Sequence, residues 1–141
     1  MDNIFYDFGK WTLTQASETG LQQLVKLLND NPNITIELSA HTDLVGDSLS
    51  NKVLSEKRAQ SVVDYLIKAG IEQQRLTPVG YGENKPVVAD VNLHKKYTFI
   101  PIKQVLDEAF ILSLPKDQQE ICNQINRRTE FKVLKTTYKL Y

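Results

Sequence analysis

An acid and an arginine stand close to the junction of two predicted elements. Asp43 directly follows an alternating segment that we expect to form a strand, and Arg58 lies one to two turns into the helix predicted next. Asn51, Leu54 or Ser55, and Arg58 recur at helical spacing, so they share one face near the start of that helix. A carboxylate and a guanidinium at one sheet edge are complementary to a small zwitterion carrying both an ammonium and a carboxylate.

Each of these residues also has a purely structural explanation. Asp43 would form an Asx turn within its own loop, and Arg58 would be a solvated helix arginine that pairs with a nearby acid. His41 is expected to be a hydrogen-bonded residue at the strand end rather than a ligand or base. Arg127 would be part of an ordinary polar start to the last strand.

Other chemistry finds no support in the sequence. There is no Gly-x-Ser-x-Gly elbow, and Gly80-Tyr81-Gly82 lacks the third glycine and the following helix of a dinucleotide fingerprint. No cysteine or carboxylate stands at metal-ligand spacing from His41 or His94. We therefore expect no enzyme activity, no cofactor and no metal ion.

Composition places the chain among ordinary globular domains. Hydrophobic residues make up 41% and charged residues 24% of its 141 residues, and seventeen basic side chains balance seventeen acidic ones. This balance argues against nucleic acid as a partner. No apolar run approaches the roughly 20 residues of a membrane helix, so we expect no direct membrane insertion. Cys122 is the single cysteine and is expected to be a small buried hydrophobe.

Strands and helices alternate along the predicted fold. We expect strands over 4–8, 34–40, 76–81 and 129–135, with Pro78 favouring an edge position or a bulge for the third. Helices are expected from Thr14 or Ser17 to about Asn31 and from about Asn51 to Ala69. Two further helices are expected over 103–114 and 116–125, whereas 87–101 shows no clear period. The pattern predicts one α/β (α+β) domain over 1–141, a two-layer sandwich with a mixed sheet and helices on one face.

The same landmarks, taken together and in order, resemble the OmpA-like domain, the peptidoglycan-binding domain of outer-membrane porins, peptidoglycan-associated lipoproteins and flagellar stator proteins. About 100 residues take part in the resemblance. The matching segments are Ile4-Phe5-Tyr6-Asp7-Phe8-Gly9-Lys10, His41-Thr42-Asp43, Asn51-x-x-Leu54-Ser55-x-x-Arg58-Ala59, Gly70-Ile71, Arg75-Leu76, Gly80-Tyr81-Gly82-Glu83, Pro86 and Asn126-Arg127-Arg128-x-Glu130-Phe131.

The resemblance implies noncatalytic binding of peptidoglycan through the meso-diaminopimelate of its peptide stem. In the family, the acid of the His-Thr-Asp motif, here Asp43, takes the ammonium. The arginine of the Leu-Ser-x-x-Arg-Ala motif, here Arg58, takes the side-chain carboxylate. The remaining positions that line the family's groove correspond to Thr42, Asn51, Leu54, Asp7 and Arg127.

Two departures from the family pattern stand out. Ala40 precedes the His-Thr-Asp motif where the family favours glycine. The segment from Pro86 to Asn126 is about twice the family's usual span, and we treat 87–125 as an insert. The insert would be a structural lid on the sheet edge, a surface for a protein partner, or a wall of the ligand groove. It is similar to inserts in multidomain lipoproteins of type IX secretion and gliding.

Three function classes follow. The first is a cell-wall anchor in the periplasm, attached to the outer membrane through the rest of a longer protein or lipoprotein. The second is a protein-interaction module of a secretion or motility complex that uses the insert. The third, an enzyme acting on cell-wall peptides, lacks a nucleophile, a base and a metal set. The start of the chain has no signal-peptide pattern, and its closeness to the first predicted strand suggests a domain excised behind an added Met1.

Overall fold

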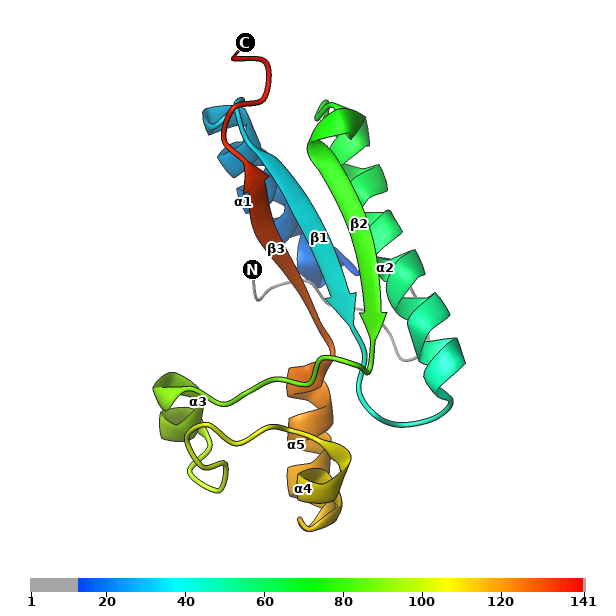
Figure 1. Ribbon diagram of the computed structural model, residues 1–141, viewed down its shortest axis with the longest axis vertical. Coiled ribbons are helices and arrows are strands. Elements are labelled where there is room, and N and C mark those ends of the chain that lie inside the picture. The colour runs from blue at the N-terminus through cyan, green and yellow to red at the C-terminus, as the bar shows by residue number, and fades with distance from the viewer. Residues whose placement is uncertain (1–12, 141) are drawn as a thin grey trace.

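The computed structural model describes residues 13–140, and its centre is a mixed three-stranded sheet (Figure 1). The strands β1 (Thr35–His41), β2 (Leu76–Gly82) and β3 (Arg128–Lys135) lie in the order β2-β1-β3. β1 pairs in parallel with β2 and antiparallel with β3, so that Leu38 lies opposite both Pro78 and Phe131. The mixed sheet predicted from the sequence is confirmed, while the strand predicted over 4–8 lies outside the described residues.

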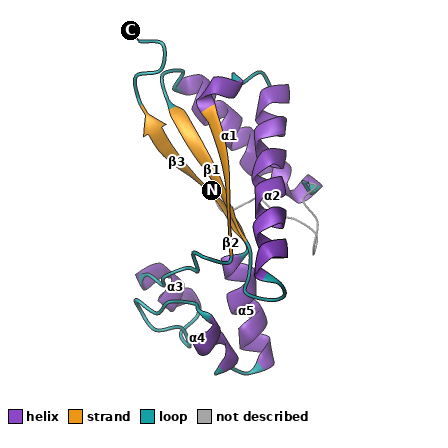
Figure 2. Cartoon of the chain, turned by 45° about the vertical axis from the view of Figure 1, so that its right-hand side comes forward, coloured by secondary structure: helices purple, strands orange, loops and turns teal. Residues whose placement is uncertain are grey.

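Two long helices cover one face of this sheet, as predicted (Figure 2). A short 3-10 turn (η1, Gln15–Ser17) leads into α1 (Glu18–Asp30), and α2 (Ser48–Lys68) connects β1 to β2. Between the helices and the sheet lies a cluster of buried side chains, because the helical and strand stripes meet there. This cluster comprises Leu21, Leu24, Leu28, Ile34, Ile36, Leu38, Val62, Val63, Leu66, Ile71 and Leu76.

Local signals account for the limits of α2. The Asp47 side chain accepts a hydrogen bond from the Ser50 backbone N–H at 2.9 Å, which caps the helix start. Gly70 follows the helix with a φ of +101°, a conformation that glycine adopts without steric cost. The helix therefore begins three residues before the expected start near Asn51 and ends one residue before the expected Ala69.

The strand β2 lies at one edge of the described sheet, as Pro78 predicts, and Arg75 secures its beginning. A 3-10 turn (η2, Gln73–Arg75) leads into the strand. The buried Arg75 guanidinium donates to the carbonyls of Leu28, Asn31 and Ile34 at 2.9, 2.7 and 3.0 Å. It thereby satisfies acceptors at the end of α1 and the entry to β1.

The insert departs in detail from the elements expected for it. Its helices are α3 (Val91–Lys96), α4 (Glu108–Leu112) and α5 (Lys116–Asn126), so the helix predicted over 103–114 is confined to its second half. Residues 102–106 instead form a turn followed by an isolated bridge from Val105 to Val88, because backbone hydrogen bonds join 103–106 to the segment 87–89. The Asp107 side chain then caps a new helix start by accepting from Phe110 N–H.

The insert has an apolar core of its own at the carboxyl ends of β1 and β2 (Figure 1). The buried side chains are Ala89, Ile100, Leu106, Ile111 and Cys122. Cys122 is fully buried, as expected, and burial raises the pKa of its thiol. Leu44, from the loop after β1, packs against this second core, so the insert is in contact with that loop.

At Gly80, β2 lies very close to the backbone of α2. This close packing leads to a prediction about stability. A Cβ at Gly80 would lie 2.3 Å from the Glu56 backbone nitrogen and 2.7 Å from its Cα. Because backbone atoms cannot move aside cheaply, Gly80→Ala should lower the free energy of unfolding by about 2 kcal/mol or more. Urea denaturation checks this.

Gly70→Ala is the matched control for the Gly80 variant. Its new Cβ would meet open space, so only the strain of positive φ applies, costing about 1 kcal/mol. If Gly80→Ala lost no more unfolding free energy than Gly70→Ala, β2 and α2 would be less tightly packed at Gly80 than the Cβ distances indicate.

Candidate functional site at the carboxyl end of the central strand

The loop that follows β1 is held by a group of short polar contacts. Asp43 is 6% exposed, and its Oδ1 accepts from the Val45 backbone N–H at 2.9 Å. This is the Asx turn that the structural explanation of Asp43 predicts. The second oxygen, Oδ2, accepts from Arg127 Nη1 at 2.6 Å, so Asp43 forms an ion pair as well as a turn.

Two further predicted residues support the same loop. The Thr42 hydroxyl donates to the Asp43 carbonyl at 2.9 Å, and the Thr42 backbone N–H donates to the Gly82 carbonyl, which ties the loop to the end of β2. The Asn51 amide, from the first turn of α2, donates to the Val45 carbonyl at 3.0 Å and to the Asp43 carbonyl at 3.4 Å. Thr42 and Asn51 therefore orient the backbone on which Asp43 sits.

Arg58 lies on the buried face of α2 and is 3% exposed. The explanation of Arg58 as a solvated helix arginine is therefore wrong, because the side chain is buried. Asp43 forms its ion pair with Arg127. Leu54, one turn earlier on α2, is half-buried, and Asp7 lies outside the described residues.

Arg127 links the sheet to the insert. It is the residue that ends α5 and precedes β3, and its backbone N–H donates to the Asn123 carbonyl. Its guanidinium bonds Asp43 through Nη1 and Glu120 through Nη2, each at 2.6 Å. These two carboxylates outweigh the effect of burial and raise the pKa of Arg127. Sequence reasoning misses Glu120, although its spacing of two helical turns before Arg127 indicates a shared face.

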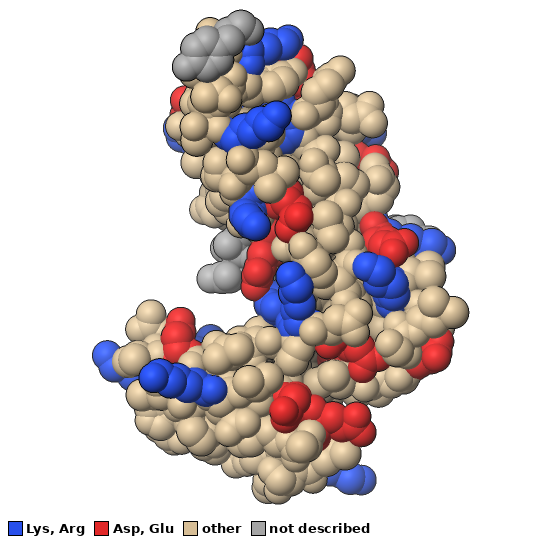
Figure 3. All heavy atoms as spheres, viewed as in Figure 1, with Lys and Arg blue, Asp and Glu red and all other residues tan. Residues whose placement is uncertain are grey.

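The open face of the sheet carries a second ionic group where the sheet meets the insert (Figure 3). Arg128 Nε bonds Glu130 Oε1 at 2.6 Å, and Lys85 Nζ lies 4.0 Å from the centre of the Tyr81 ring. His41 stacks on Tyr81 at 5.2 Å, and neither of its ring nitrogens has a hydrogen-bond partner within residues 13–140. The expectation of a hydrogen-bonded His41 is therefore wrong, because the ring is enclosed by stacking instead.

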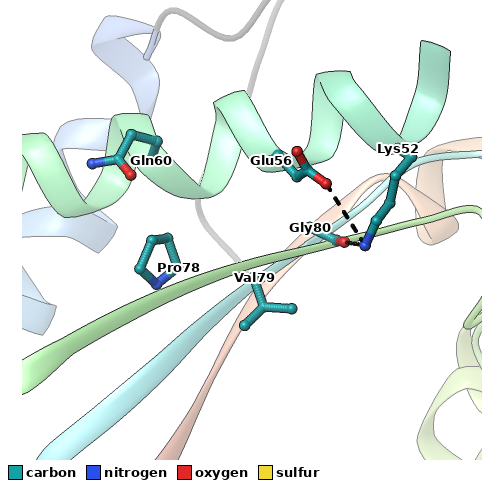
Figure 4. Close-up of a pocket in the computed structure, with 6 residues that line it drawn as sticks. All are labelled: Lys52, Glu56, Gln60, Pro78, Val79 and Gly80. Atoms are coloured by element: carbon teal, nitrogen blue, oxygen red, sulfur yellow. Dashed lines mark hydrogen bonds and ion pairs between the residues drawn. The ribbon is translucent and has the colours of Figure 1, made fainter. Parts of the chain in front are cut away.

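A hollow of about 330 Å³ lies elsewhere, between α2 and the outer edge of β2 (Figure 4). Its lining residues are Lys52, Glu56, Gln60, Pro78, Val79 and Gly80. Lys52 Nζ donates to the Gly80 carbonyl and lies 3.8 Å from Glu56 Oε1. Of the predicted site residues within 13–140, none lines this hollow, and Lys52 covers part of the backbone edge that a further strand would need.

Comparison with known proteins identifies the family of this chain. The model of the OmpA family matches residues 5–98, well over half of the chain. The chain belongs to the OmpA family. Domains of this family typically bind peptidoglycan and are non-enzymatic, in agreement with the expectation of no catalysis. The match includes the His-Thr-Asp and Leu-Ser-x-x-Arg-Ala motifs and ends within the insert, before Arg127.

Individual relatives are consistent with that assignment. Outer membrane protein A of Escherichia fergusonii is 37% identical over 90 residues, which are 62% of this chain and 37% of that protein. A segment of the photosystem I P700 chlorophyll a apoprotein A2 of Gloeobacter violaceus is 38% identical over 86 residues, 61% of this chain but 10% of that protein. The chain thus spans well under half the length of these relatives.

A solved structure shares the fold. The peptidoglycan-associated lipoprotein of Burkholderia pseudomallei superimposes with a TM-score of 0.62 at 22% identity, covering 95% of this chain and 89% of that one. The proteins similar to this chain thus include an outer-membrane protein and a lipoprotein. No helix within residues 13–140 of the present chain has the length and apolar character needed to cross a membrane.

The unpartnered His41 generates a prediction about acid stability. Burial, followed by the charges of Arg128 and Lys85, lowers the pKa of His41 to about 4, below the value near 6.5 expected in the unfolded chain. The unfolded state thus binds more protons between pH 6.5 and about 4, and the contribution of neutral His41 to stability is lost as the pH falls through this window. His41→Phe keeps the stacking ring and removes the titration.

The measurement is urea denaturation of both proteins at a series of pH values. Relative to wild type, His41→Phe should gain up to about 3 kcal/mol between pH 6.5 and 4, since one pKa unit corresponds to about 1.4 kcal/mol. Parallel stability curves would mean that His41 does not limit acid stability.

Proposed function

We propose that this chain binds peptidoglycan noncovalently through the meso-diaminopimelate of its peptide stem. By this binding it anchors an outer-membrane protein or lipoprotein to the cell wall from the periplasm. The supporting observation is a buried carboxylate paired with a guanidinium at the carboxyl end of β1, within a family that typically binds peptidoglycan. Residues 1–141 act as one binding domain in this proposal, with 87–125 as its insert.

The charges at this site match the tip of the diamino acid. Diaminopimelate differs from lysine by a second carboxylate beside the side-chain ammonium. In the proposed complex, Asp43 accepts the ammonium, whereas Arg58 binds the carboxylate with its planar fork and Arg127 lies beside both groups. Thr42 and Asn51 hold the Asp43 loop, and Leu54 and Asp7 complete the groove.

The energetics favour weak single contacts and firm attachment in the cell. Each charge-assisted bond contributes about 1.5–3 kcal/mol net, and the ligand ammonium must share Asp43 with Arg127. A single stem should therefore bind with a Kd of about micromolar or weaker. The wall presents many stems around a tethered domain, so the effective concentration is high and dissociation of one stem is followed by capture of another.

Titration of soluble stem peptides tests the proposal. Wild type should bind a diaminopimelate tripeptide at least tenfold more tightly than the lysine tripeptide, because lysine lacks the carboxylate that Arg58 binds in this proposal. Asp43→Asn should weaken diaminopimelate binding by tenfold or more. Arg58→Lys should reduce the preference for diaminopimelate, since an ammonium lacks the fork. Isothermal titration calorimetry provides the Kd values, and thermal unfolding shows whether each variant is folded.

Asp64→Asn is the matched control, because it removes the same charge from an exposed position of α2. It should bind as wild type does. Equal binding of both peptides by wild type would refute the diaminopimelate specificity. Absence of binding to either peptide and to purified sacculi would refute the function itself.

A second candidate function is protein docking through the insert, as a module of a secretion or motility complex such as type IX secretion. The observation that favours this function is a set of apolar side chains in the insert that are exposed to solvent and lie outside its buried core. Val88 and Val105, 58% and 37% exposed, are paired with each other in an isolated bridge. Other exposed apolar residues in the insert are Val91, Ile102 and Leu112.

Charge placed on this surface separates the two functions. Val88→Asp with Val105→Asp should leave the Kd for stem peptide unchanged, since both side chains are solvent-exposed. In the full-length parent protein, a photo-crosslinker at Ile102 should yield one product of defined mass in cells, and the double substitution should remove it. An unchanged product would place the partner elsewhere.

A further inference from the structure

One guanidinium binds two carboxylates at the edge of the candidate site. Arg127 donates to Asp43 and to Glu120, and the side chains of Asp43, Arg127 and Glu120 are 8%, 26% and 64% exposed. The three groups thus run from the buried loop after β1 to the surface of α5. Glu120 belongs to the insert and has no counterpart among the residues that the family motifs indicate.

The charge count at this triad bears on how an ammonium would bind. The Arg127 guanidinium has the opposite charge to Asp43, so it offsets part of the attraction that the carboxylate exerts on an incoming cation. Glu120 adds one negative charge at the second terminal nitrogen of the guanidinium, and the triad carries a net charge of −1. A carboxylate has about four acceptor positions, and those of Asp43 accept from Val45 N–H and Arg127. Acceptor capacity therefore remains for a ligand.

The insert holds these groups on a well-supported helix. Asn126, at the end of α5, is 1% exposed; its amide accepts from the Val87 N–H at 2.9 Å and donates to the Leu106 carbonyl at 3.0 Å. Cys122, which lies between Glu120 and Arg127 in the sequence, packs in the core of the insert. The direction in which α5 presents Glu120 and Arg127 is therefore determined by the packing of the whole insert.

We propose that Glu120 is a positioning residue of the ligand site, which binds the second terminal nitrogen of Arg127 and supplies the negative charge that helps Asp43 to accept an ammonium. The insert then contributes a wall of the groove, the third of the roles considered for it. This inference rests on the proposed binding of a diamino acid at Asp43. It adds a residue that tunes affinity for the ammonium specifically.

Glu120→Gln tests the role of the charge while preserving an acceptor for Arg127. Binding of the diaminopimelate tripeptide should weaken about 3- to 10-fold at low ionic strength. The difference from wild type should shrink in high salt, since Glu120 is largely exposed and its field is screened. Asp117→Asn removes an exposed charge from the same helix and should bind as wild type does.

A second ligand distinguishes charge balance from a general structural effect. In a tripeptide whose side-chain amine is acetylated, the ammonium is absent, so wild type, Glu120→Gln and Asp117→Asn should share one residual affinity. An equal loss for both ligands, or no loss for either, would overturn the role of Glu120 while the proposed function stands. Failure of wild type to bind the unmodified tripeptide would instead overturn the proposed function and this inference with it.

Discussion

The central position of β1 determines which groups meet at its carboxyl end. Because β1 pairs with β2 on one side and with β3 on the other, the loop after His41 lies beside both the end of β2 and the beginning of β3. Thr42 bonds Gly82 from the first neighbour, and Asp43 bonds Arg127 just before the second. Residues 84 positions apart in the sequence thus share one ion pair, and no local interaction could bring them together.

The insert is better understood as a second small core attached to this site than as a surface decoration. Its buried side chains pack around Ile100 and Leu106, and Leu44 from the site loop joins them. The junction between α5 and β3 is also where Arg127 emerges. A change in the packing of the insert would therefore move the Arg127 guanidinium, which holds Asp43. In this way a segment that departs from the family pattern is physically connected to the His-Thr-Asp motif that the family shares.

Buried polar and charged side chains are concentrated near the site. Asp43, Arg58 and His41 are each at most 6% exposed, and burial of ionisable groups opposes folding unless the protein or a ligand compensates for the lost hydration. Asp43 is compensated by Arg127 and by the Val45 N–H, whereas His41 remains neutral and stacks on Tyr81. A domain selected only for stability would carry apolar side chains at these positions. Their presence agrees with a site that is shaped for a charged ligand.

Local patterns in the sequence were sufficient for most of the framework. Alternation predicts β1, helical spacing predicts α1 and α2, and Pro78 predicts the edge position of β2, because these features depend on neighbours within a few residues. The motifs also indicate Asp43 and Arg58 before any contact is known. In the insert, the same method places a helix over 103–114, where backbone hydrogen bonds to the segment at Ala89 keep the first half out of the helix. Only the tertiary structure decided that Arg127 pairs with Asp43, that Glu120 joins them and that Arg58 is buried, since each of these depends on how distant segments pack and not on the residues beside it.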